Sequence, residues 1–159
     1  RQVMIDIDFE SELWLERPGY AFLDDQTMFY KLYKMGYITL LVSDAKYIHE
    51  DAKTSTRELK LEPIYAFSFN HYIFWHRFIY SLHTNKFDKL IDIIAFNYWY
   101  IMNILYNKVR NHKDKEVVNK LRAGVKDGKK YVRTKYYKNL PPIESKYEID
   151  RKIKLEENY

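Results

Sequence analysis

The spacing of apolar residues in the first third of the chain predicts strands on either side of one helix. Every second residue is apolar at the start, which predicts a short strand within residues 1–16 that leads into a loop. Residues 24–35 place apolar side chains three and four apart, as an amphipathic helix does. Residues 37–43 are continuously apolar and predict a buried strand, and residues 46–49 predict a second extended piece. This order is typical of an α/β layer.

From residue 62 onward the pattern changes to long apolar and basic stretches. Residues 64–82 and 87–106 are apolar and aromatic, and both are long enough for helices. Residues 116–137 predict a basic helix, which Gly124 and Gly128 are expected to weaken. The chain therefore divides into an α/β part, a helical extension and a charged, flexible tail, over residues 1–58, 59–142 and 143–159.

Charge is distributed unevenly along this chain of 159 residues, whose net charge is +5. Residues 1–107 have a net charge of −3, whereas the segment from Lys108 to Lys138 holds 12 basic and 3 acidic side chains. Such a segment indicates an anionic partner, either a membrane surface or a phosphate backbone. The chain has no cysteine, which excludes disulfides and thiolate chemistry.

The two apolar stretches have two interpretations that the sequence leaves open. Residues 90–106 number only 17 and include Asp92, Asn97 and Asn103, whereas a membrane span needs about 20 mostly apolar residues. We therefore expect no span. The stretches either pack on each other and on the α/β layer, or form an amphipathic helix at a membrane surface, where tyrosine and tryptophan are favoured.

A set of short motifs occurs in a fixed order across residues 5–49. The first is an aromatic and acidic segment at residues 9–16, and the second is the acidic pair Asp24-Asp25 at a helix start. The third is Gly36-Tyr37 at the end of that helix, and the last is His49. In this order they resemble the second half of family 2 glycosyltransferases, which have the A-type (GT-A) nucleotide-sugar fold. Bacterial members that build surface polysaccharides carry an aromatic stretch similar to residues 74–80.

The resemblance implies a role for each matching residue. Asp25 matches the catalytic base that takes a proton from the acceptor hydroxyl, and Asp24 would orient the acceptor or its loop. His49 matches a histidine that ligates the divalent ion, Mn²⁺ or Mg²⁺, that holds the donor diphosphate. The plain alternatives are that the acidic pair only stabilises a helix N-terminus and that the histidine is structural.

Three residues before the acidic pair match the segment in which the family binds its acceptor: Trp14, Glu16 and Tyr20. An aromatic face in this segment can stack on a sugar ring. For Trp14 the alternative is that the indole closes the core.

The family's nucleotide-binding half has no counterpart in this sequence. Asp6-Ile7-Asp8 has the letters of the metal-binding Asp-x-Asp, but it lies about 16 residues before the acidic pair, without βαβ units ahead of it. We therefore interpret Asp6 and Asp8 as loop acids. The resemblance thus predicts that this chain is the acceptor-side part of an inverting glycosyltransferase that acts in cell-surface polysaccharide synthesis. We expect this part to be inactive by itself. The enzyme would use a nucleotide-sugar donor and a saccharide or lipid-linked acceptor, in the cytoplasm at the inner face of the cell membrane.

Non-enzymatic functions fit the same composition. The segment from Lys108 to Lys138 would let a helical module bind an anionic membrane surface or nucleic acid, with tyrosines stacking on bases in the latter case. We expect no nucleic-acid partner, because the charge is spread along a helix and the sequence has no nucleic-acid-binding motif. A structural helical domain with a solvated charged face is the third interpretation.

Overall fold

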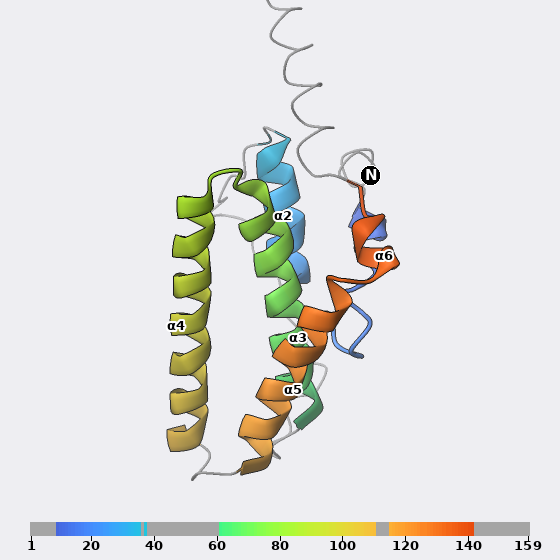
Figure 1. Ribbon diagram of the computed structural model, residues 1–159. Helices are drawn as coiled ribbons and strands as arrows, with labels where there is room; N and C mark the ends of the chain where they lie inside the picture. Colours follow the sequence, from blue (N-terminus) through green and yellow to red (C-terminus); the bar gives the residue numbers. More distant parts are fainter. Residues whose placement is uncertain (1–8, 36, 38–60, 111–114, 142–159) are drawn as a thin grey trace, which may run out of the picture.

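The fold is mostly helical in the part of the chain that the structure describes. The structure is a computed structural model, and it describes residues 9–35, 37, 61–110 and 115–141 (Figure 1). The elements within these ranges are η1 (Phe9–Ser11), α2 (Asp24–Lys34), α3 (Leu61–Phe78), η2 (Tyr80–Leu82), α4 (Lys86–Arg110), α5 (Lys115–Tyr131) and α6 (Lys135–Lys138), where η marks a 3₁₀ helix.

The expectation of an α/β fold with GT-A-type strands is wrong for the described residues, which contain no strand. Backbone groups after η1 instead bond locally in successive turns, with Glu12 N donating to Phe9 O at 3.0 Å and Leu15 N to Glu12 O at 3.0 Å. Gly19 N continues the series by donating to Glu16 O at 2.9 Å. A segment whose N–H groups are satisfied in this way needs no neighbouring strand. The other predicted strand positions, apart from Tyr37, lie outside the described residues.

The predicted helix at residues 24–35 is confirmed, since α2 begins at Asp24 and Met35 caps its C-terminus. The three longer helical stretches are also confirmed, with changed ends. The first divides into α3 and η2, and the second is α4. The basic helix ends at Tyr131, and α6 follows after Thr134, whose side chain caps α6 by accepting a hydrogen bond from Tyr137 N at 3.3 Å.

Helix α3 is the centre of the molecule, and both hydrophobic clusters include it. The first cluster joins the segment before α2 to α3 and α5: Trp14, Leu15, Phe69, Ile73, Phe78 and Tyr131. The second joins α3 to α4 and α5: Tyr72, Trp75, Phe96 and Val125. Residues before α2 therefore share one core with the helical extension.

The two neighbours of α3 approach it to different extents. A Cβ atom on Gly124 of α5 would lie 2.4 Å from the backbone oxygen of Tyr65, so α5 and α3 meet at near backbone contact. Large rings separate α3 from α4 instead, and His71 stacks on Trp99 with ring centroids 3.6 Å apart. Burial lowers the pKa of His71 to about 4.

Within the described ranges, no helix combines the length and the apolar character needed to cross a bilayer.

Candidate functional site

A buried carboxylate fixes the segment between η1 and α2. The Glu12 side chain is fully buried, accepts a hydrogen bond from Trp14 Nε1 at 2.6 Å and pairs with Lys31 Nζ at 2.7 Å. Arg77 Nη2 lies 2.8 Å from the same carboxylate and also donates to the carbonyl oxygen of Pro141 at 3.0 Å. Glu12 therefore links the N-terminal segment to α2 and to α3, and Arg77 continues the link to Pro141 after α6.

The carboxyl group of Glu12 stays ionised because of its partners. Burial raises its pKa, but the charges and hydrogen bonds of Arg77 and Lys31 together outweigh burial, so the pKa lies below its usual value. Two buried cations face this one carboxylate. We therefore assign Glu12 a positioning role rather than one in proton transfer.

A single amide on α3 holds the loop that leads to α2. Asn70 Nδ2 donates to the carbonyl oxygens of Leu15 at 2.9 Å, Tyr20 at 3.1 Å and Phe22 at 3.0 Å. Asn70 is fully buried. Since the three carbonyls belong to residues spread over the whole loop, this amide fixes the path of the loop into α2.

The first turn of α2 presents two carboxylates to solvent. Leu23, which precedes α2, has φ 70° and ψ 17°, in the left-handed region. This conformation costs an L-residue about 1–2 kcal/mol, so the fixed loop around it must enforce it. Asp24 and Asp25 follow, and both side chains are exposed. Carboxylates at this position interact favourably with the positive end of the helix dipole.

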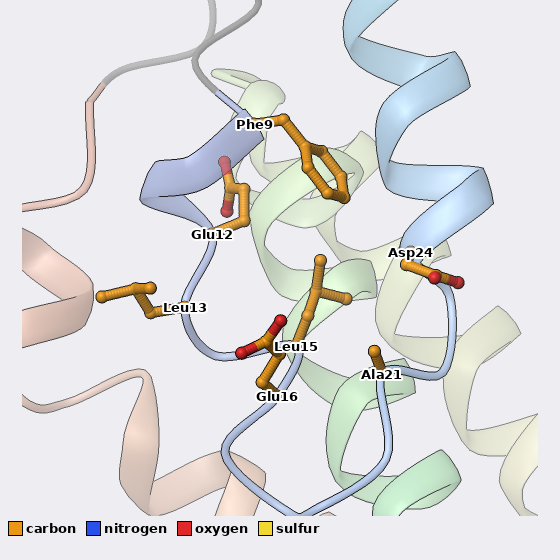
Figure 2. Close-up of a pocket in the computed structure, with 7 residues that line it drawn as sticks. All are labelled: Phe9, Glu12, Leu13, Leu15, Glu16, Ala21 and Asp24. Atoms are coloured by element: carbon orange, nitrogen blue, oxygen red, sulfur yellow. The ribbon is translucent and has the colours of Figure 1, made fainter. Parts of the chain in front are cut away.

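A pocket of about 260 Å³ lies between this turn and the segment after η1. Its lining residues are Phe9, Glu12, Leu13, Leu15, Glu16, Ala21 and Asp24. Figure 2 shows Asp24 across the pocket from Glu12 and Glu16, with the side chains of Phe9 and Leu15 between them and the Asp24 carboxylate pointing away from them. The volume is just below the range of about 300–1,000 Å³ typical of small-molecule pockets, so it suits one ring or one small group.

The structure brings some of the predicted site residues together. Asp24 and Glu16 both line the pocket, and Asp25 lies beside Asp24 in the same helical turn. Tyr20 is 40% exposed and stacks on Phe22 with ring centroids 6.0 Å apart.

Trp14 does not have the place that the resemblance implied. Its side chain is 0% exposed and belongs to the first hydrophobic cluster. A ring without an exposed face cannot stack on a ligand, so the interpretation that Trp14 closes the core fits this structure.

The predicted metal ligand cannot be placed, because His49 lies outside the described residues. Within residues 9–35, 37, 61–110 and 115–141, no three side chains of histidine, cysteine, aspartate or glutamate gather as metal ligands do. We therefore assign no residue of these ranges to a metal ion.

The positioning residues Glu12, Lys31, Asn70 and Arg77 are absent from the prediction based on sequence. One signal could have found two of them. Asn70 and Arg77 interrupt the most apolar predicted helix and are seven residues apart, which places them on one helix face. Polar residues on a buried face require partners, so this spacing indicates a buried polar network.

Comparison of this chain with protein-family models, with curated proteins and with solved structures gives no match. The arrangement of the site is therefore the basis for a functional proposal, together with the ordered motifs.

Proposed function

We propose that this chain supplies the acceptor-binding part of a sugar transferase, with Asp25 as its catalytic base. The observation that carries the proposal is the acidic pair on the exposed first turn of α2, beside a pocket that Asp24 and Glu16 line. The order of motifs, which resembles that of family 2 glycosyltransferases, supports the same function. The donor would be a nucleotide sugar, and the acceptor a saccharide or a lipid-linked sugar at the inner face of the cell membrane.

In this proposal, Asp25 removes the proton from an acceptor hydroxyl while the hydroxyl oxygen forms a bond to the anomeric carbon of the donor. The nucleoside diphosphate leaves with the electron pair of the broken bond. A base must stay within hydrogen-bond reach of that hydroxyl, and the first turn of α2 holds Asp25 on a regular helix. Asp24, Glu16 and Tyr20 would contact the acceptor around the pocket.

Rigid support of the α2 turn is a requirement of this chemistry, because a misplaced catalytic group loses much of its effect. The buried bonds of Glu12 and Asn70 supply that support from α2 and α3. The donor site and any Mn²⁺ or Mg²⁺ that holds the diphosphate are not assigned to the described residues. We accordingly expect the 159 residues alone to show no transfer.

The experiment uses the complete polypeptide that the gene encodes, with a panel of nucleotide sugars and a lipid extract as acceptor. We expect Asp25→Asn to lower kcat by about 10²–10⁴-fold, the usual contribution of a general base, with nucleotide binding little changed. The matched control is Asp88→Asn, which removes a carboxylate from the first turn of α4 and should leave kcat within about twofold.

Two results would contradict the proposal. The first is an unchanged kcat in Asp25→Asn, which removes Asp25 from the mechanism. The second is a complete wild-type polypeptide that transfers sugar from none of the donors.

A further inference from the structure

Helix α4 presents an exposed apolar face with the spacing of a coiled coil. Its apolar side chains follow one another at alternating intervals of four and three residues and are 48–66% exposed: Phe87, Ile91, Ile94, Tyr98, Ile101 and Leu105. We call these residues the α4 seam. They occupy successive d and a positions of a heptad repeat, which is the pattern by which two helices pack side by side.

The opposite side of α4 packs on its own chain. Phe96, at the heptad position farthest from the seam, is 6% exposed, and its ring centroid lies 5.3 Å from that of Tyr72 and 4.5 Å from that of Trp75 on α3. Figure 1 shows α4 at the edge of the molecule, with the other described helices on one side of it only. The seam therefore faces away from α3 and is accessible to a partner.

Apolar side chains also flank the seam. Leu90, Met102 and Val109 are 52%, 46% and 82% exposed and occupy the e and g positions, where coiled coils often carry glutamate or lysine. From residue 90 to residue 105, no seam or flanking position is charged. The face thus lacks the cations by which interfacial helices bind anionic lipids, and it fits an equally apolar protein surface.

The face is large enough for a stable contact between two copies. Residues 87–109 extend over about 34 Å, and half of the surface of a helix about 12 Å across is then about 650 Å². Two copies joined by this face would bury about 1,300 Å² in total, within the range of about 1,200–2,000 Å² for specific, stable interfaces. The area is therefore sufficient for a dimer without any further element.

We propose that α4 pairs with α4 of a second copy, as two antiparallel helices related by a two-fold axis. The seam is self-complementary in this arrangement, because a positions of one copy face d positions of the other. Each contact occurs twice: Phe87 with Leu105, Ile91 with Ile101, and Ile94 with Tyr98. This pairing goes beyond the proposed function and does not depend on it.

Charges at the ends of the seam favour the antiparallel direction. Lys108 is exposed and occupies the d position after Leu105. In a parallel pair, the two copies of Lys108 would face each other, and like charges in contact oppose association. In the antiparallel pair, Lys108 lies about one helical turn from Asp88 of the second copy, so opposite charges are neighbours instead.

The first test is sedimentation of the 159-residue chain over a series of concentrations. We expect the mass of wild type to approach twice the 19.5 kDa of one chain as the concentration rises. Ile94→Glu/Ile101→Glu should raise the dissociation constant at least about a hundredfold, because each copy then brings two unpaired carboxylates into the contact.

The matched control is Tyr33→Glu/Tyr136→Glu, which adds the same two charges at side chains 73% and 78% exposed outside α4. This control should keep a dissociation constant within about twofold of wild type. All four substituted side chains are exposed, and circular dichroism verifies that both variants remain folded.

A second measurement determines the direction of the pair and does not depend on these variants. Because the chain has no cysteine, Asn97→Cys and Val109→Cys can each carry one spin label. The two-fold axis passes between Ile94 and Tyr98, so the two labels at position 97 should lie within about 20 Å of each other. The labels at position 109 should lie about 40 Å apart, since each is about 13 residues from the axis.

Four results would overturn the proposal. A wild-type mass of one chain at every concentration excludes the pair, and a mass above two chains excludes a closed dimer. Short distances at both labelled positions indicate parallel helices. A monomer that floats with phosphatidylcholine and phosphatidylserine vesicles, and no longer does so as Ile94→Glu/Ile101→Glu, would assign the seam to a lipid surface.

Discussion

Replacing Glu12 by glutamine tests whether the buried charge cluster holds the candidate site in place. Glu12→Gln keeps the size of the side chain but removes the negative charge that faces Lys31 and Arg77, whose side chains are 3% and 7% exposed. Removing one partner from a buried ion pair costs about 3–5 kcal/mol. The free energy of unfolding of a domain is about 5–15 kcal/mol, so this substitution should remove a large part of it.

The assay is urea denaturation followed by tryptophan fluorescence, since Trp14 lies within the cluster and reports its opening. Glu16→Gln is the matched control, because Glu16 is exposed, and it should change the free energy of unfolding by less than about 0.5 kcal/mol. If Glu12→Gln costs less than about 1 kcal/mol, the two cations do not depend on Glu12 and the reasoning fails.

A triple replacement separates lost charge balance from lost packing. Glu12→Leu/Lys31→Met/Arg77→Met removes all three charges and keeps the volume of the cluster. Apolar replacement of a complete buried ion cluster is often neutral or stabilising, so the triple variant should be more stable than Glu12→Gln. A triple variant that is less stable than Glu12→Gln would show that packing, not uncompensated charge, determines the loss.

Further predictions concern the α3–α5 contact and the dependence of stability on pH. Gly124→Ala should destabilise the chain by about 1–2 kcal/mol in urea denaturation, although alanine favours a helix by about 1 kcal/mol, because the new methyl group meets the Tyr65 backbone oxygen. Asn119→Ala, on the exposed side of α5, should be neutral or slightly stabilising, and a stabilised Gly124→Ala would contradict the contact. His71 has a pKa lowered from 6.5 to about 4, so the unfolded chain binds its proton first and stability should fall as the pH decreases from 6.5 towards 4. The pKa of Glu12 is also lowered, which extends the loss below its usual value of 4.5. His71→Phe should reduce only the earlier part of the loss, to which His76 with its lowered pKa also contributes, and an unchanged pH profile would contradict this assignment.

Local signals in the sequence predicted the helices well. Asp24 at the start of α2 and the cations Lys31 and Lys34 in its last turn act on the residues next to them, so they could be interpreted without the fold. The break between α5 and α6 was missed, although Thr134 is a favoured capping residue.

Contacts between distant segments could not be predicted in the same way. Gly124 was expected to weaken a helix, whereas the structure places it where only a glycine lets α5 approach α3. Glu12 and Arg77 are 65 residues apart, and nothing next to either residue indicates the other. Of the candidate site, the sequence predicted the position of Asp24 and Asp25 but not the buried bonds that support them.

The position of Arg77 also has a consequence for the order in which the chain folds. Its bonds to Glu12 and to the carbonyl of Pro141 span 65 and 64 residues, so both require the closure of long loops. Because synthesis proceeds from the N-terminus, Glu12 has no guanidinium partner until α3 has been made, and Arg77 lacks its second acceptor until Pro141 follows. We therefore expect the pocket beside Asp24 to take its final shape late in folding, after α3 has docked, rather than as a unit that the N-terminal residues form by themselves.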